Sequence, residues 1–320
     1  MASYSDKLIS KGLIKTPRWF SNSVQYETIM GSVVYGVSND TSDMDIYGFC
    51  IPPKRVVFPH TDGWIPKFNK PGESFDQLNP KGIEDKERRK IYDLDIYNIV
   101  KYFKLCAECN PNMIDSLFTP LRCVLHCTPI GEIVRSNRKL FLSKKAWHTF
   151  KGYAYSQLSK LRKSNIKYIT INKKISNVCK MRTKNPQPGS KRALDIKEHG
   201  FDCKFAYHLV RLLDEVQQIL ETGDLVLGRN AEEMKAIRRG EWTVEQVYAK
   251  VDTMTPILED LYGKSTLRHS PDWDGLTKVL LNCLEEYYGT LENCIIEEDV
   301  EAAALREIIQ LADRALKRSK

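Results

Sequence analysis

Two aspartates that alternate along a predicted strand constrain this chain more than any other feature. Asp43 and Asp45 lie in the run DMDIYGFCI, whose other residues are largely apolar or aromatic on both faces. Residues i and i+2 of a strand project to the same side, so both carboxylates point together. A buried carboxylate without a partner is costly, and a metal ion would remove that cost. Magnesium takes one or two carboxylates and completes its shell with water and substrate phosphates.

A glycine-serine pair upstream of the aspartates predicts a place for phosphate. Gly31 lets a phosphate approach the backbone closely, and the hydroxyl of Ser32 can donate a hydrogen bond to it. We expect Tyr35 and Gly36 to shape the rest of this loop. The alternative is a surface hairpin that turns at residues 39–42, but the apolar character of the second strand argues against it. Nucleotide chemistry is therefore the first hypothesis.

The order of these motifs resembles a known superfamily. A Gly-Ser pair, a spacer of about ten residues and Asp-x-Asp resemble the signature of the DNA polymerase beta superfamily of nucleotidyltransferases. Within it, GSVVYG followed by SDMDIYG resembles the RNA repair pathway family, RlaP. Three further stretches resemble that family: YNIVKYFKLCAECNPNMIDSL, GFDCKFAYHLVRLLDEVQQILETG and STLRHSPD. The resemblance implies an α+β fold, with a polymerase-beta-type nucleotidyltransferase sheet and flanking helices, followed by a mainly helical C-terminal domain.

The resemblance also implies a reaction that uses two metal ions. Two Mg²⁺ ions, or Mn²⁺ in their place, would support transfer of a nucleoside monophosphate from an NTP to a hydroxyl group. Asp43 and Asp45 would share the ions, and a third carboxylate would come from a neighbouring strand. Asp93 and Asp95 share one face of a strand predicted over residues 89–97, and both qualify. The family pattern favours Asp93, whereas Asp95 could instead cap the next helix.

A polar stripe lies on a helix predicted over residues 202–221. Lys204, His208, Arg211 and Glu215 fall at positions i, i+4, i+7 and i+11, and such stripes are usually solvated. The first three match a Lys-x-Ala-x-His-x-x-Arg pattern of the resembling family, which implies contact with the triphosphate. The predicted nucleotide-binding residues are therefore Gly31, Ser32, Tyr35, Lys204, His208 and Arg211.

The 320 residues are enough for two domains. We predict a nucleotidyltransferase catalytic domain over residues 1–140 and a helical domain that binds substrate or nucleotide over residues 141–320. The catalytic domain would contain strands at 28–33, 43–51 and 89–97. Helices are predicted at 98–108, 113–118, 144–162, 202–221, 243–262, 270–288 and 299–318, with a loop at 172–199. Asp202 is expected to cap its helix. Tyr153 would face the cleft, although a buried core tyrosine is the simpler interpretation.

Charge and composition indicate the partners. The formal net charge is +8, and residues 139–192 contain many Lys and Arg but no Asp or Glu. Such a segment suits a polyanion, either RNA or the triphosphate itself, although most charge runs are solvated surface. An odd number of cysteines, nine, indicates free thiols in a reducing compartment. We find no apolar run of membrane-spanning length and no signal peptide, so the expected location is the cytoplasm, with no membrane partner.

These observations favour a template-independent, metal-dependent nucleotidyltransferase that modifies an RNA end, either a tRNA or an RNA 3′ end. Absence of a recognisable helix-hairpin-helix element supports template independence. One alternative acceptor is a protein side chain or a small molecule, as in AMPylation. Another hypothesis is a non-catalytic RNA-binding protein of the same fold. The presence of Ser32, Asp43 and Asp45 together argues against this last hypothesis.

Overall fold

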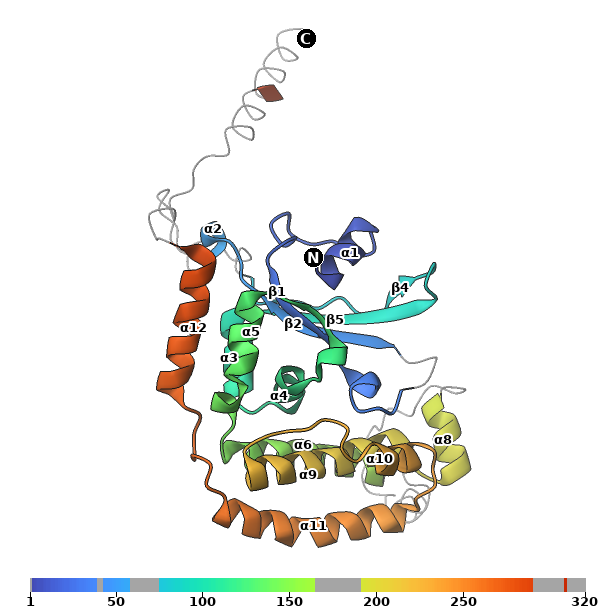
Figure 1. Cartoon of the computed structure of the whole chain (residues 1–320). Helices are drawn as coiled ribbons and strands as arrows, with labels where there is room; N and C mark the ends of the chain where they lie inside the picture. The colour runs from blue at the N-terminus through green and yellow to red at the C-terminus, as the bar shows by residue number, and fades with distance from the viewer. Residues whose placement is uncertain (1, 39–42, 58–74, 165–190, 290–307, 310–320) are drawn as a thin grey trace, which may run out of the picture.

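A mixed β-sheet forms one layer of the molecule and a group of helices lies beneath it, so the fold is α+β (Figure 1). The computed structural model describes residues 2–38, 43–57, 75–164, 191–289 and 308–309. The strands of the described part follow the order β3 (Gln77–Leu78), β5 (Lys90–Asn98), β2 (Met44–Cys50), β1 (Val24–Ile29) and β6 (Val124–Cys127), and β4 (Ile83–Asp85) also pairs with β5. Strands β2 and β5 are parallel, and the other pairs are antiparallel.

The two faces of the sheet bury different cores because side chains alternate along each strand. Ile46 and Leu94 point to the face that is covered by α1 (Tyr4–Ser10), where they join Leu8 in one hydrophobic cluster. Phe49 points to the opposite face, where it packs with Tyr102 in a second, larger cluster. The carboxylates of β2 and β5 lie on this second face, which is turned towards the helices.

Helices on this second face begin at clear capping residues. They are α3 (Ile99–Ala107), capped by Asn98; α4 (Pro111–Phe118), capped by Asn110; and α5 (Pro129–Ser136), capped by Thr128. Each cap accepts a hydrogen bond from a backbone N–H of the first turn, and proline opens both α4 and α5. Helix α4 lies between the sheet and the lower helices (Figure 1). All of its residues except Asn112 are buried.

The lower layer is built from long helices (Figure 1). They are α6 (Lys145–Ser164), α8 (Lys191–His199), α9 (Cys203–Thr222), α10 (Ala231–Arg238) and α11 (Val244–Lys264). Helix α12 (Trp273–Tyr288) then returns to the sheet beside α5 and α3, and the Tyr288 hydroxyl donates to the carbonyl of Pro52. One hydrophobic cluster is continuous from Phe49 under the sheet to Leu258 of α11. The two predicted domains thus share a core, and their boundary at residue 140 stays a prediction.

The predicted elements agree with the structure at most helices and differ from it elsewhere. The first strand is β1, not residues 28–33, because Gly31–Val33 form a 3₁₀ turn that begins with Gly31 at φ +67°. Part of the predicted loop, residues 191–199, is helix α8. The cap of α12 is Asp272, not the predicted Ser270-Pro271 start. The sequence analysis missed β3, β4, β6, α5 and α10, which are short. The predicted helix at 299–318 lies almost wholly outside the described residues.

No helix in the described ranges is both long and apolar enough to span a membrane.

Candidate active site

Asp45 and Asp93 lie opposite each other on neighbouring strands. The parallel register of β2 and β5 pairs Asp45 with Asp93 and Tyr47 with Asp95. All four side chains therefore lie on the same face of the sheet. Asp45 is partly buried, whereas Asp43 is exposed and stands just before β2 begins. The register thus brings the predicted third carboxylate, Asp93, beside the Asp-x-Asp motif.

The Gly31-Ser32 turn lies directly against Asp45. A Cβ at position 31 would stand 2.1 Å from Oδ2 of Asp45, and Gly31 adopts φ +67°, which side chains rarely tolerate. The N–H of Met30 also donates to the carbonyl of Asp45, at 2.7 Å. Both contacts hold the turn against β2 at Asp45. Glycine is therefore needed here for two reasons, its backbone angle and the space that Asp45 occupies.

Lys81 and Gly82, on the connection between β3 and β4, bind the carboxylates of Asp93 and Asp95. Lys81 Nζ lies 2.5 Å from Asp95 Oδ2 and 4.0 Å from Asp93 Oδ2, and the N–H of Gly82 donates to Asp93 Oδ1 at 2.8 Å. Asp95 is buried, and its carboxylate is already paired with Lys81. The alternative role for Asp95 as a helix cap is wrong, because Asn98 caps α3. Asp93 is the more accessible of the two.

Burial dominates the electrostatics of Asp45. It raises the pKa of Asp45 above the usual value, the neighbouring Asp93 raises this pKa further, and Asp43 adds a smaller effect in the same direction. Lys81 and Lys204 lower the pKa of Asp45 in part. A second cation from the helical layer therefore lies within electrostatic range of the carboxylates. The arrangement favours cations at this place on the sheet.

Helix α9 brings Lys204 to the site from below. Asp202 caps the helix, as predicted, by accepting from the N–H groups of Lys204 and Phe205. The polar stripe on α9 is not uniformly solvated. Lys204 is exposed, His208 is partly buried, and Arg211 is buried. The stripe therefore runs from the site at Lys204 into the interior of the protein.

Arg211 belongs to a buried ionic cluster that joins three elements. Its Nη1 lies 2.6 Å from Asp115 Oδ2 of α4 and 2.8 Å from Glu215 Oε1 of α9. The guanidinium also stacks over the ring of Tyr35 at 4.2 Å, and the Tyr35 hydroxyl donates to Asp115 at 2.5 Å. Tyr35 is three residues after Ser32, so this ionic cluster ties the Gly31-Ser32 loop to both helices.

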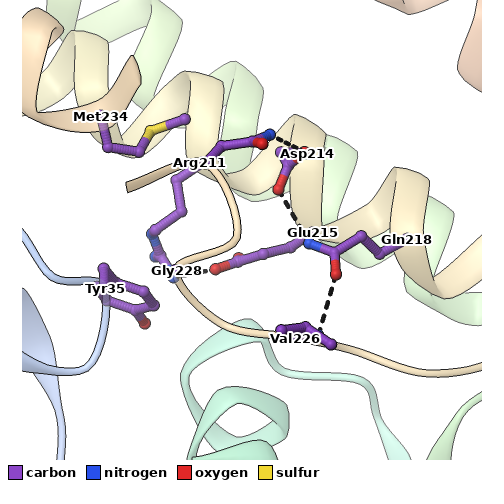
Figure 2. Close-up of a pocket in the computed structure, with 9 residues that line it drawn as sticks. Tyr35, Arg211, Asp214, Glu215, Gln218, Val226, Gly228 and Met234 are labelled. Atoms are coloured by element: carbon purple, nitrogen blue, oxygen red, sulfur yellow. Dashed lines mark hydrogen bonds and ion pairs between the residues drawn. The ribbon is translucent and has the colours of Figure 1, made fainter. Parts of the chain in front are cut away.

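Figure 2 shows Arg211, Glu215 and Tyr35 of this ionic cluster beside a small cavity, with Arg211 reaching from α9 towards Tyr35. The cavity volume open to the centre of a water molecule is about 20 Å³. Burial raises the pKa of Asp115 and raises that of Glu215 well above its usual value, and Arg211 lowers both pKa values in part. The charge of Asp115 raises the pKa of Glu215 further. Tyr35 and Arg211 are thus held by protein groups, and their predicted contact with the nucleotide stays a prediction.

Two residues of the site escaped the sequence analysis. Lys81 lies on a segment that reads as a loop, and only its Pro-Lys-Gly context marks a turn. Asp115 is the single acidic residue in the apolar run PNMIDSLF, and such a position is the signal that could have identified a buried ion pair.

The carboxylates of the site suit magnesium only when phosphates and water complete its coordination shell. Across the described ranges, no three His, Cys, Asp or Glu side chains stand together as a ready metal site. Asp45 and Asp93 nevertheless provide two adjacent carboxylates, and Asp43 stands within electrostatic range of Asp45. Magnesium takes this number of carboxylates when phosphates and water supply the remaining ligands. The residues therefore fit a metal that arrives with a nucleotide.

Comparisons with known proteins agree with the motifs. The model of RlaP, the RNA repair pathway DNA polymerase beta family, matches residues 9–289. An uncharacterized 38.9 kDa protein in the nrdC-mobD intergenic region of enterobacteria phage T4 is 25% identical over 137 residues, which are 42% of this chain and 37% of that protein. The chain thus spans little more than a third of that relative's length.

One solved structure is a nucleotidyltransferase-like protein from Exiguobacterium sibiricum 255-15. The alignment covers 98% of this chain and 90% of that protein, at 8% identity and a TM-score of 0.26. Similarity at that level carries no argument about the fold or the site.

Proposed function

Because the chain belongs to the RNA repair pathway DNA polymerase beta family, we propose that it transfers a nucleoside monophosphate from an NTP to a hydroxyl group of an RNA end, without a template. The observation that carries this proposal is the pairing of Asp45 with Asp93 beside the Gly31-Ser32 turn. This pairing supplies two adjacent carboxylates and a turn against which a phosphate can lie.

The reaction balances with no further co-reactant. The acceptor hydroxyl oxygen bonds to the α-phosphorus, the bond between the α-phosphorus and the bridging oxygen breaks, pyrophosphate leaves, and the hydroxyl proton passes to solvent. Asp43, Asp45 and Asp93 would hold Mg²⁺ ions, which when bound activate the acceptor hydroxyl and neutralise the leaving pyrophosphate. Asp95 stays paired with Lys81 and so holds the connection between β3 and β4 against β5.

The phosphates of the NTP have donors on two sides. The Gly31-Ser32 turn contributes its backbone and the Ser32 hydroxyl from the sheet, whereas Lys204 and His208 come from α9. Lys204 is exposed and acts electrostatically on Asp45, so its ammonium group can reach an anion held at the carboxylates. His208 lies one turn further along the same helix.

The basic character of α6 supports RNA as the acceptor. The described part of the basic segment has Lys145, Lys160 and Arg162 exposed on this helix. Residues 165–190, which contain further predicted RNA contacts, lie outside the described residues. Phosphate contacts of this kind give salt-dependent affinity. Replacing Lys145 and Lys160 by Met should reduce RNA affinity and lower the salt slope by about two.

A transfer assay with each radiolabelled NTP and Mg²⁺ tests the proposal against RNA, protein and small-molecule acceptors. We expect label in RNA. The double variant Asp43→Asn with Asp45→Asn should lose transfer but keep RNA affinity, while Asp252→Asn, at an exposed site on α11, should behave as wild type. Label found only in protein or in a small molecule would replace RNA as the acceptor. Undiminished transfer by the double variant would overturn the catalytic assignment.

A further inference from the structure

Tyrosines follow the carboxylates along both β2 and β5. Tyr47 follows Asp45 by two residues on β2, and Tyr97 follows Asp95 by two residues on β5, so all four side chains share one face. Burial raises the pKa of Tyr97 to about 12, and the charge of nearby Asp95 contributes. Tyr47 and Tyr97 are both half-buried and pack against the larger hydrophobic cluster, so each leaves part of its side chain accessible beside the carboxylates.

Tyr153 of α6 completes this row from the helical layer. Its side chain is exposed, with the whole residue at 40% exposure, which contradicts the simpler interpretation of a buried core tyrosine. Its hydroxyl accepts a hydrogen bond of 2.9 Å from Nδ2 of Asn110, the cap of α4. Tyr153 is also close enough to Tyr97 to raise that residue's pKa. The ring is thus held in place and left accessible.

One of the tyrosines and a phenylalanine of α9 each have a lysine over the ring. Lys101 Nζ lies 5.9 Å from the centre of the Tyr97 ring, and Lys160 Nζ lies 5.6 Å from the ring of Phe205, next to Lys204 in the chain. Aromatic rings interleaved with cations are the combination that holds single-stranded nucleic acid, because rings stack on bases and cations attract phosphates. Here that combination adjoins the proposed catalytic carboxylates.

We propose that Tyr97 and Tyr153, supported by Tyr47, form a stacking platform for the nucleobase of the nucleotide that reacts at Asp45. The proposal rests on the proposed function for its location and adds a base-binding subsite to it. The base belongs either to the incoming NTP or to the terminal nucleoside of the RNA, and both present the same flat aromatic face. Stacking alone accepts any of the four bases.

Kinetics of four variants test the platform. Tyr153→Ala and Tyr97→Leu remove a ring, and each should raise one KM about 5- to 100-fold with a smaller effect on kcat. Tyr153→Phe keeps the ring and should act as wild type. If Tyr153 acted only through its hydrogen bond with Asn110, Tyr153→Phe would raise KM as much as Tyr153→Ala. The matched control is Tyr155→Ala on the same helix, since Tyr155 is 53% exposed but turned about 200° away around the helix axis.

The affected KM identifies the source of the base. A raised KM for NTP assigns the platform to the incoming nucleotide, and a raised KM for RNA assigns it to the acceptor end. Unchanged KM values for both substrates in Tyr153→Ala and Tyr97→Leu would overturn the proposal. Circular dichroism of each variant checks that it is folded.

A binding experiment separates this proposal from the proposed function. Fluorescence of 2-aminopurine riboside triphosphate and of a 2-aminopurine-ended oligoribonucleotide reports stacking without any transfer. Inorganic tripolyphosphate serves as the competitor that lacks a base. Loss of the ring at position 153 or 97 should weaken binding of a fluorescent probe but leave tripolyphosphate binding unchanged. If no acceptor is ever labelled, the proposed function fails, yet ring-dependent binding would still establish the platform. Binding of both probes that is equal to wild type would reject it.

Discussion

Gly31 and Asp45 are in such close contact that a methyl group on the glycine would overlap the carboxylate, with 2.1 Å between Cβ and Oδ2. The contact joins the turn proposed to receive phosphate to the carboxylate proposed to hold metal. A displacement of either group is therefore transmitted to the other. This coupling makes position 31 a sensitive probe of the site.

Gly31→Ala should reduce nucleotide transfer by at least about 100-fold, because it must push aside the turn or Asp45. The control is Gly12→Ala. Gly12 has almost the same backbone angle, φ +68°, but nothing lies within 4 Å of a Cβ built there. Both variants carry similar backbone strain of about 1–2 kcal/mol. Thermal unfolding should show a larger loss of stability in Gly31→Ala, because only this variant adds an overlap with Asp45 to the shared backbone strain, and steady-state transfer rates should show a far larger loss of activity. Equal activity of the two variants would contradict the assignment.

Lys81→Met should move the acidic limb of the pH–rate profile to higher pH. Burial and then Asp93 raise the pKa of Asp45, whereas Lys81 lowers it, so removing the Lys81 charge raises this pKa further. Metal binding needs the ionised carboxylate, and activity would therefore fall at a higher pH on acidification. Lys86→Met, at an exposed position in the turn between β4 and β5, should leave the limb in place. A shift to lower pH in Lys81→Met would exclude this electrostatic coupling.

Arg211→Met should destabilise the protein by about 3–5 kcal/mol, since it leaves Asp115 and Glu215 buried without their cation. Urea unfolding followed by far-UV circular dichroism measures the effect. Arg239→Met breaks an exposed ion pair with Glu241 and should have little effect. A small loss at Arg211 would mean that the ionic cluster does not hold the loop and helices together.

Glu215→Gln should become progressively more stable than wild type as the pH rises above about 4.5. Burial raises the pKa of Glu215 in the folded state well above its usual value of 4.5, so the unfolded chain binds fewer protons than the folded protein above that pH. The wild type therefore loses stability between pH 4.5 and the raised pKa, whereas the glutamine has no proton to lose. Unfolding free energies of both proteins, measured from pH 4.5 to 8, test this difference. Parallel curves would show that the pKa is not raised.

Lys204→Met should raise the KM for NTP about 10- to 100-fold through loss of a charge-assisted contact with phosphate. Adenosine, which has no phosphate, should inhibit wild type and variant equally. Lys197→Met, at an exposed position on α8, is the matched control for the loss of one positive charge. An unchanged KM in Lys204→Met would remove α9 from the phosphate site.

The sequence predicted the carboxylates but not their partners. Alternation along a strand places Asp43 with Asp45, and Asp93 with Asp95, because it depends only on spacing within one strand. The choice between Asp93 and Asp95 depends on the register of β2 with β5, which no local pattern specifies. The ion pair of Lys81 with Asp95 is likewise tertiary.

The stripe on α9 shows a second limit of prediction from spacing. Helical periodicity correctly places Lys204 and Arg211 on one side of the helix, but it does not say how deep each residue lies. The helix passes beneath the Tyr35 loop and α4, so Lys204 is exposed and Arg211 is buried with Asp115. The cap of α9 was better predicted, since Asp202 acts within one turn of its own chain.

The parallel pairing of β2 with β5 also bears on the order of folding. Strands β1 and β2 are sequence neighbours and pair antiparallel, so they can form a local hairpin that contains Gly31 and Asp45. Asp93 is 48 positions after Asp45, that is, 93 minus 45, and reaches it only when β5 docks across a long connection. Closing such a loop costs entropy before its contacts form, so this step is slow. The pair of carboxylates is therefore complete only late in folding, and a chain stalled at the hairpin would hold half of the site.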